Sequence, residues 1–152
     1  MTTSERTSMY TTYLKDEGFS PTVNRHDDIE FKFEGMTYIV EVDERDEEYF
    51  RVFVPHILRI EDEDDRALAL AAADHANTTT KAIEIILVGD HVWASLETFL
   101  ASTDAFKPVF RRYLRALQVG MHHFATHLRE HAGSGAQPAK DVAATAAGVL
   151  SA

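Results

Sequence analysis

The stretch DIEFKFEGMTYIVEVDE, residues 28–44, decides the fold because its pattern predicts two β-strands joined by a tight turn. Apolar side chains occupy every second position in residues 28–34 and again in residues 36–43. Such alternation gives a strand one apolar face and one polar face. The Glu34-Gly35 pair suits a short turn because glycine adopts positive φ without a steric penalty. The sequence therefore predicts an antiparallel hairpin with one polar face.

The segment before this hairpin predicts a short helix and an edge strand. Residues 4–17 repeat apolar side chains at i,i+4 spacing, and Gly18 stands where a helix commonly ends. Thr2 and Glu5 have the spacing of a capping box at the start of this helix. Residues 19–24 predict a short strand, and the proline within it confines that strand to a sheet edge because proline has no amide donor.

Further strand patterns follow the hairpin. Residues 49–60 are apolar at both odd and even positions, which is typical of a strand that is covered on both faces or of a strand that runs into a helix. We expect this segment to be central in the sheet or to lie at a subunit contact. Residues 82–88 and 92–96 flank Gly89-Asp90 and predict a second hairpin.

The second half of the chain also contains helical patterns. The acidic run Glu61–Asp65 opens an alanine-rich segment that extends to Asn77, and the helix macrodipole favours carboxylates at such a start. From Asp104, apolar residues recur at the helical period and predict a long amphipathic helix. Residues 133–152 are small and rich in Gly and Ala, so we expect a flexible tail there.

Together these elements predict an α+β fold with the order α-β-β-β(-β)-α-β-β-α. We expect an antiparallel sheet of five to six strands with the helices packed on one face. A chain of 152 residues with 45% hydrophobic content supports one core. We therefore predict a single domain at residues 1–132, followed by the tail at residues 133–152.

Composition excludes several classes of function. The chain has 25 Asp plus Glu against 15 Lys plus Arg, and nucleic-acid binding requires clustered cations. It has no cysteine, which excludes disulfides, thiolate metal sites and thiol chemistry. No apolar run is long enough to span a membrane, and the first residues lack the apolar segment of a signal peptide. We therefore expect no nucleic-acid or membrane partner and a cytoplasmic location.

The sequence also lacks the common signatures of catalysis. It contains no G-x-S-x-G elbow, no P-loop and no G-x-G-x-x-G motif. Glu30, Glu41 and Glu84 fall on polar strand faces, where no apolar surroundings raise the pKa of a carboxyl group. We therefore predict a protein that is not an enzyme, with no catalytic residue and no cofactor.

One histidine-rich segment, MHHFATHLREH at residues 121–131, resembles a metal site. His123, His127 and His131 repeat at i,i+4, and the last two flank Glu130 in the inverted zincin pattern H-x-x-E-H. Because that pattern marks larger enzymes with a further carboxylate ligand, we assign no metal site and keep these histidines as candidates. The alternatives are solvated histidines at the core boundary and a pH-responsive element.

Two acidic runs, residues 43–48 and 61–65, are interpreted as solvated surface segments. The second run lacks the ligand spacing and central glycine of a calcium loop. The first lies in a predicted loop between strands, where its charge also suits a basic segment of a partner.

Aromatic residues fall on the strand face that a one-sided sheet leaves uncovered. Tyr49 and Phe53 share that parity, Ile57 continues it, and Trp93 lies among polar neighbours on its own strand. Exposed apolar patches of this kind commonly mark a partner, and a second copy of the chain is the simplest cover. We therefore assign Tyr49, Phe53, Ile57 and Trp93 to a dimer or client surface. The alternative is that the N-terminal helix and the tail cover these residues within the monomer.

Several landmarks occur in an order that resembles a known family. They are Tyr13-Leu14, Gly18-Phe19, the hairpin at residues 28–44, the helix ending DHANTTTKA, the strands AIEIILVGDHVWASLETFL and the closing helix from Phe106. Over residues 8–130 the chain resembles the YbjN family of bacterial sensory-transduction regulators, whose domain is similar to the dimeric type III secretion chaperones. The resemblance implies a type III secretion chaperone-like domain that forms a homodimer and works by protein binding or regulation.

The sequence thus predicts a non-enzymatic cytoplasmic protein-binding or regulatory domain that holds an extended or amphipathic client segment. One alternative is a metal- or pH-responsive regulator built on the histidines of the last helix. Another is a small-ligand sensor with a pocket between that helix and the sheet.

Overall fold

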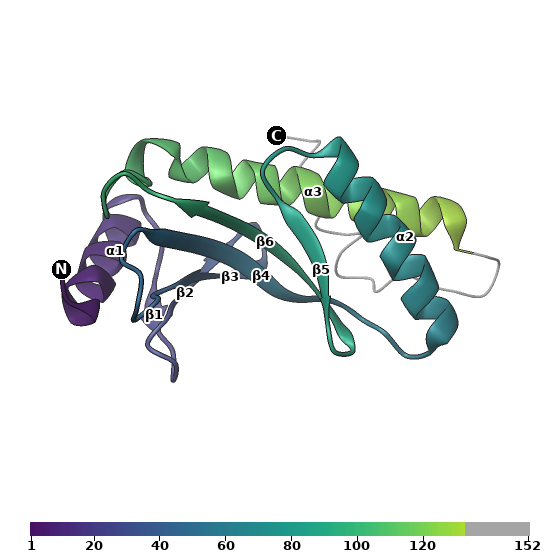
Figure 1. Cartoon of the computed structure of the whole chain (residues 1–152), viewed down its shortest axis with the longest axis horizontal. Helices are drawn as coiled ribbons and strands as arrows, with labels where there is room; N and C mark the ends of the chain where they lie inside the picture. Colours follow the sequence, from purple (N-terminus) through teal and green to yellow (C-terminus); the bar gives the residue numbers. More distant parts are fainter. Residues whose placement is uncertain (133–152) are drawn as a thin grey trace.

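A computed structural model describes residues 1–132 as one open antiparallel sheet of six strands with three α-helices (Figure 1). The chain order α-β-β-β-β-α-β-β-α confirms the predicted α+β class. Across the sheet the strand order is β1-β2-β3-β4-β6-β5. The predicted tail lies outside the described residues. The elements are α1 (Thr3–Asp16), β1 (Thr22–Val23), β2 (Ile29–Phe33), β3 (Met36–Glu41), β4 (Tyr49–Arg59), α2 (Glu63–Thr79), β5 (Glu84–Val88), β6 (His91–Phe99), a 3-10 turn (Lys107–Val109) and α3 (Phe110–His131).

The hairpin that decides the fold is present as β2 and β3. Phe33 pairs with Met36, so the turn between the strands holds only Glu34 and Gly35. Both turn residues have positive φ, 48° and 79°, as a type I′ turn requires. The apolar face of this hairpin packs into the core, as the alternation predicts.

The central strand β4 pairs with β3 on one side and with β6 on the other. Its register with β6 shifts between Val54 and Leu58, where the intervening residues of β4 all lie opposite Trp93. This is a β-bulge: Pro55 has no amide to donate to the ladder, and His56 adopts a φ of 56°. The bulge turns the Ile57 side chain into the core, and Leu58 is again in register, opposite Val92.

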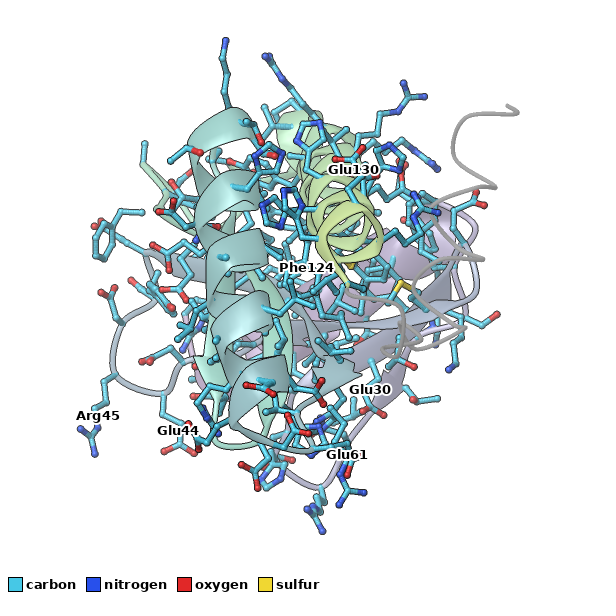
Figure 2. The ribbon with its side chains drawn as sticks, turned by 90° about the vertical axis from the view of Figure 1, so that its right-hand side faces the viewer. Glu30, Glu44, Arg45, Glu61, Phe124 and Glu130 are labelled. Atoms are coloured by element: carbon cyan, nitrogen blue, oxygen red, sulfur yellow. The ribbon has the colours of Figure 1, made fainter. Side chains whose placement is uncertain are left out.

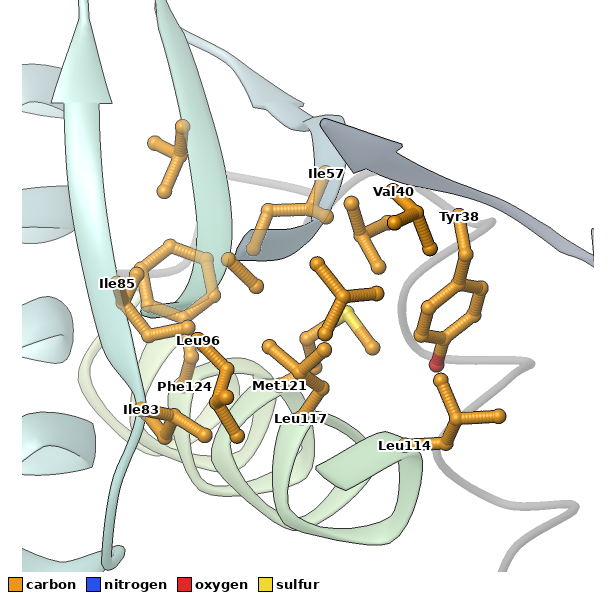
Figure 3. Close-up of a cluster of buried hydrophobic side chains, with 14 of the residues drawn as sticks. Tyr38, Val40, Ile57, Ile83, Ile85, Leu96, Leu114, Leu117, Met121 and Phe124 are labelled. Atoms are coloured by element: carbon orange, nitrogen blue, oxygen red, sulfur yellow. The ribbon is translucent and has the colours of Figure 1, made fainter. Parts of the chain in front are cut away.

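One hydrophobic core lies between the sheet and the helices. Helices α2 and α3 lie side by side over one face, and α1 covers the end of that face near the start of α3 (Figure 1). On α3, Phe124 lies on the inner side and Glu130 on the outer side (Figure 2). Figure 3 shows side chains filling the space between α3 and the sheet, including Tyr38, Val40, Ile57, Ile83, Ile85, Leu96, Leu114, Leu117, Met121 and Phe124.

Helix α3 begins later than its apolar period predicts. The pattern extends back to Asp104, but the helix starts at Phe110 and follows a 3-10 turn. Pro108 lies in that turn, and proline disfavours the α conformation in the residue before it. Phe106 is buried in the core all the same. None of the helices in residues 1–132 is long and apolar enough to cross a membrane.

The two edges of the sheet offer little free backbone. At one edge β1 comprises only two residues. At the other edge, the Asn77 side chain of α2 accepts a hydrogen bond from the Ile85 amide at 2.7 Å and donates one to the Ile85 carbonyl at 3.1 Å. The amide side chain therefore takes the place that a neighbouring strand would occupy.

Candidate functional site

The face of the sheet turned away from the helices is here called the open face. It carries Ile39 of β3, Phe53 of β4 and Trp93 of β6, which alternate along their strands with residues of the core. Ile39 and Phe53 are buried, yet neither belongs to the core cluster beneath the helices. Trp93 is partly exposed. Within residues 1–132, the open face thus has its own apolar centre beside solvent.

Aromatic rings form the centre of the open face. The rings of Phe53 and Trp93 are parallel, with an interplanar angle of 2° and centroids 5.3 Å apart. The ring of His56, placed by the bulge, meets Trp93 edge-on at 5.6 Å. The guanidinium carbon of Arg51 lies 4.5 Å from the centre of the Phe53 ring. Phe53 is covered by these neighbours, whereas Trp93 remains available at the surface.

A polar network borders the aromatic stack on β3, β4 and β6. Arg51 forms ion pairs with Glu41 at 2.8 Å and with Glu97 at 3.2 Å. The Arg51 side chain also donates to the Ser95 hydroxyl at 3.0 Å, and that hydroxyl donates to Glu97 at 3.1 Å. Arg51 is thus bound through its Nε and Nη1 atoms to groups on its own sheet, beside the stack.

The open face is hollowed next to the stack. A cavity of about 970 Å³ extends from Trp93 across β4 and β3 to the loops after β1 and β3. The Trp93 ring nitrogen is shielded from solvent and has no hydrogen-bond partner within the described chain. The lining residues are Asn24, Arg25, His26, Asp28, Glu30, Ile39, Glu41, Val42, Asp43, Glu44, Arg51, Phe53, Pro55, His56 and Trp93.

The structure brings together part of the predicted client surface. Phe53 and Trp93 are in contact, while Tyr49 lies farther along β4, with its ring 6.1 Å from that of the exposed Phe99. Burial, with the nearby Glu97 carboxylate, raises the pKa of the Tyr49 hydroxyl. Placing Ile57 on this surface was wrong, because its side chain lies in the core under the helices (Figure 3). Ile57 lies within the bulge, where the regular alternation on which that prediction depended is interrupted.

Sequence reasoning missed the residue that organises the loop at the edge of this cavity. Arg6 of α1 is 2% exposed and donates to the carbonyl oxygens of Asp43 and Asp46. The Asp43 carboxylate accepts bonds from the Arg45 and Asp46 amides, and these bonds lower the pKa of Asp43. A lone arginine in a helix pattern carries no sign of such a distant partner.

The predicted histidines of α3 meet another histidine from α2. The ring of His75 lies 5.0 Å from that of His127 and 6.3 Å from that of His123. The hydroxyls of Thr79 and Thr80 lie 3.0 and 2.9 Å from the His123 Nδ1 atom. Burial, followed by the charges of neighbouring histidines, lowers the pKa of both His123 and His127.

In the described residues these histidines are not grouped as a metal site requires. No group of three or more His, Cys, Asp or Glu side chains in residues 1–132 has the arrangement needed to hold an ion. The rings of His127 and His131 stack at 4.0 Å, and the His131 Nδ1 atom lies 2.9 Å from the His127 carbonyl. Within the H-x-x-E-H pattern, His131 is thus held by its own helix, whereas His127 also faces His75 of α2.

Comparison with known proteins assigns no family, since neither a protein-family model nor a curated protein matches the chain.

Proposed function

We propose that this protein is a non-enzymatic protein-binding domain that holds a client segment on its open face. The observation that carries the proposal is the partly exposed Trp93, stacked on the buried Phe53 beside the cavity. A rigid aromatic platform with adjacent polar groups is the usual anchor of a protein interface. The resemblance to the YbjN family and to type III secretion chaperones points to the same class of function.

The geometry favours binding through side chains rather than by addition of a strand. Strand addition requires a sheet edge with free backbone groups. Asn77 already bonds both backbone groups of Ile85 on β5, and β1 is only two residues long. A client segment would therefore lie across the open face and place a side chain against Trp93.

The test is selection of a phage library of random dodecapeptides on the whole chain and, separately, on a Trp93→Ala variant. We expect peptides that enrich on the wild type and fail to bind the variant. Because Trp93 is the only tryptophan, its fluorescence reports directly whether a selected peptide reaches the open face. Enrichment that is identical on both proteins, with no change in Trp93 emission, would reject the proposal.

A second copy of the chain is the competing occupant of the open face, as the predicted homodimer requires. Light scattering coupled to gel filtration distinguishes the two occupants, since a client-binding face stays free in the purified protein. The cytoplasmic location expected from the sequence fits either occupant.

A second candidate function is a pH-responsive regulator, and the contact of His75 with His123 and His127 favours it. Two helices that meet through histidine rings lose affinity for each other when the rings become charged. Hydrogen exchange of the α2 amides at about pH 7.5 and about pH 5.5 tests this function. After correction for the slower intrinsic amide exchange in acid, we expect lower protection of the α2 amides in acid for the wild type and a smaller change for a His75→Gln variant. The same change in both proteins would reject this function.

A further inference from the structure

We propose that the client segment is basic, with a lysine or arginine that packs along Trp93 and ends among the carboxylates of the cavity. This inference rests on the proposed function of the open face. It adds the chemical class of the client, which the aromatic stack alone leaves undefined.

The cavity is lined by more carboxylates than guanidinium groups, which favours a cationic occupant. Its carboxylates are Asp28, Glu30, Glu41, Asp43 and Glu44, and its guanidinium groups are Arg25 and Arg51. Arg51 is already paired with Glu41 and Glu97. Within residues 1–132, the side chains of Glu30 and Glu44 form no ion pair and no hydrogen bond. Both lie on the side of the molecule opposite Glu130 (Figure 2).

The aromatic stack suits the same occupant. Trp93 presents a ring at the wall of the cavity, and the ring of Phe53 is occupied by Trp93 and by Arg51. Lysine and arginine bury an apolar stem along such a ring while the charged end stays near water or a carboxylate. Arg51 over Phe53 is an example within this chain of the contact that a client would make with Trp93.

Charge also argues against a second copy as the occupant. The chain has a formal net charge of −10. If two open faces met, the excess carboxylates of one copy would lie against those of the other. Like charges placed across an interface oppose association, whereas a basic segment gains attraction over the whole approach.

The composition of the peptides selected with Trp93 dependence provides the first test. We expect enrichment of Lys and Arg over the unselected library. If the peptides that depend on Trp93 are neutral or acidic, the proposed protein-binding function stands, but the inference that the client is basic is overturned. The absence of any Trp93-dependent peptide would overturn the function and, with it, this inference.

The second test removes two negative charges from the cavity lining. A matched control removes two negative charges from another part of the surface. A Glu30→Gln, Glu44→Gln variant is compared with a Glu63→Gln, Asp64→Asn variant, which loses the same charge at the exposed start of α2. Affinity for the selected peptide, measured by fluorescence anisotropy, should fall about threefold to tenfold for the first variant and little for the second.

Added salt should weaken peptide binding by the wild type more than by the Glu30→Gln, Glu44→Gln variant, because the variant has lost the ion pairs with the peptide that salt screens. Equal affinities of the two variants would overturn the inference, since attraction would then depend on net charge alone.

Discussion

At the scale of single residues, Arg6 joins the first helix to the acidic loop beside the cavity. Its guanidinium is buried and donates to two backbone carbonyls, those of Asp43 and Asp46. Hydrogen bonds from a charged group contribute about 1.5–3 kcal/mol, and the carbonyls would lose their partner. We therefore expect Arg6→Ala to lower the free energy of unfolding by about that amount in urea denaturation.

Arg111→Ala is the matched control, because Arg111 bonds the carboxylate and the backbone carbonyl of Glu17, at 2.7 and 2.9 Å, on the exposed surface. An exposed ion pair contributes at most about 1 kcal/mol. Equal losses for the two variants would show that Arg6 contributes no more than a surface arginine.

Gly120 on α3 lies so close to Ile83 that a larger residue does not fit without a shift. A Cβ atom at this position would lie 2.6 Å from Cδ1 and 2.8 Å from Cγ1 of Ile83, which is buried. Overpacking costs about 1–3 kcal/mol, and the helix propensity of alanine returns about 1 kcal/mol. We expect Gly120→Ala to destabilise the protein by up to about 2 kcal/mol in thermal or urea unfolding.

The Ile83→Ala background separates this clash from other effects. With the Ile83 side chain shortened, Gly120→Ala should cost less or even stabilise the protein, because the space it needs is then open. A cost that is the same in both backgrounds would show that the contact with Ile83 is not its cause.

At the scale of elements, α2 meets α3 through histidine rings, and two of these histidines have lowered pKa values. The pKa values of His123 and His127 lie below the ordinary 6.5, chiefly because of burial. The groups that face them are His75, Thr79 and Thr80 from α2, and His122, Glu130 and His131 from α3 itself.

A depressed histidine pKa makes stability rise with pH. Between the folded-state pKa and 6.5, the unfolded chain binds more protons, so acid favours unfolding in this window. The stabilisation is complete above pH 6.5 and is lost as pH falls toward the folded-state pKa. Urea unfolding of the wild type and of His123→Gln across this window should show a shallower slope for the variant; parallel curves would contradict the prediction.

Asn77 of α2 protects the outer edge of the sheet at β5 from pairing with another strand. Its side chain satisfies the amide and the carbonyl of Ile85 on the outer strand β5. Asn77→Ala should cost about 1–2 kcal/mol and expose an edge that pairs with other chains. Thr78→Ala, an exposed neighbour that bonds only to its own helix, is the control. Urea unfolding and light scattering measure both effects, and matching results for the two variants would contradict the role of Asn77.

At the scale of the whole molecule, the sequence predicts those features that local periods determine. The period of two in β2 and β3 and the helical period of α3 give the class, the element order and most of the core. The bulge was not predictable, because a positive φ at His56 follows from the pairing of β4 with β6 and not from its neighbours in the chain. Ile57 was misplaced for that reason. The contacts of Arg6 and His75 likewise depend on tertiary packing.

The acidic lining of the open face predicts the oligomeric state of the protein in solution. If the face binds a basic client, its acidic lining opposes self-association, and Trp93→Ala should leave the oligomeric state of the purified protein unchanged. Leu70→Ala, at an exposed apolar residue of α2, is the control for loss of apolar surface. Light scattering coupled to gel filtration measures the mass, and circular dichroism confirms that each variant is folded. A wild-type dimer that only Trp93→Ala dissociates would place a second copy on the open face and remove it as a client site.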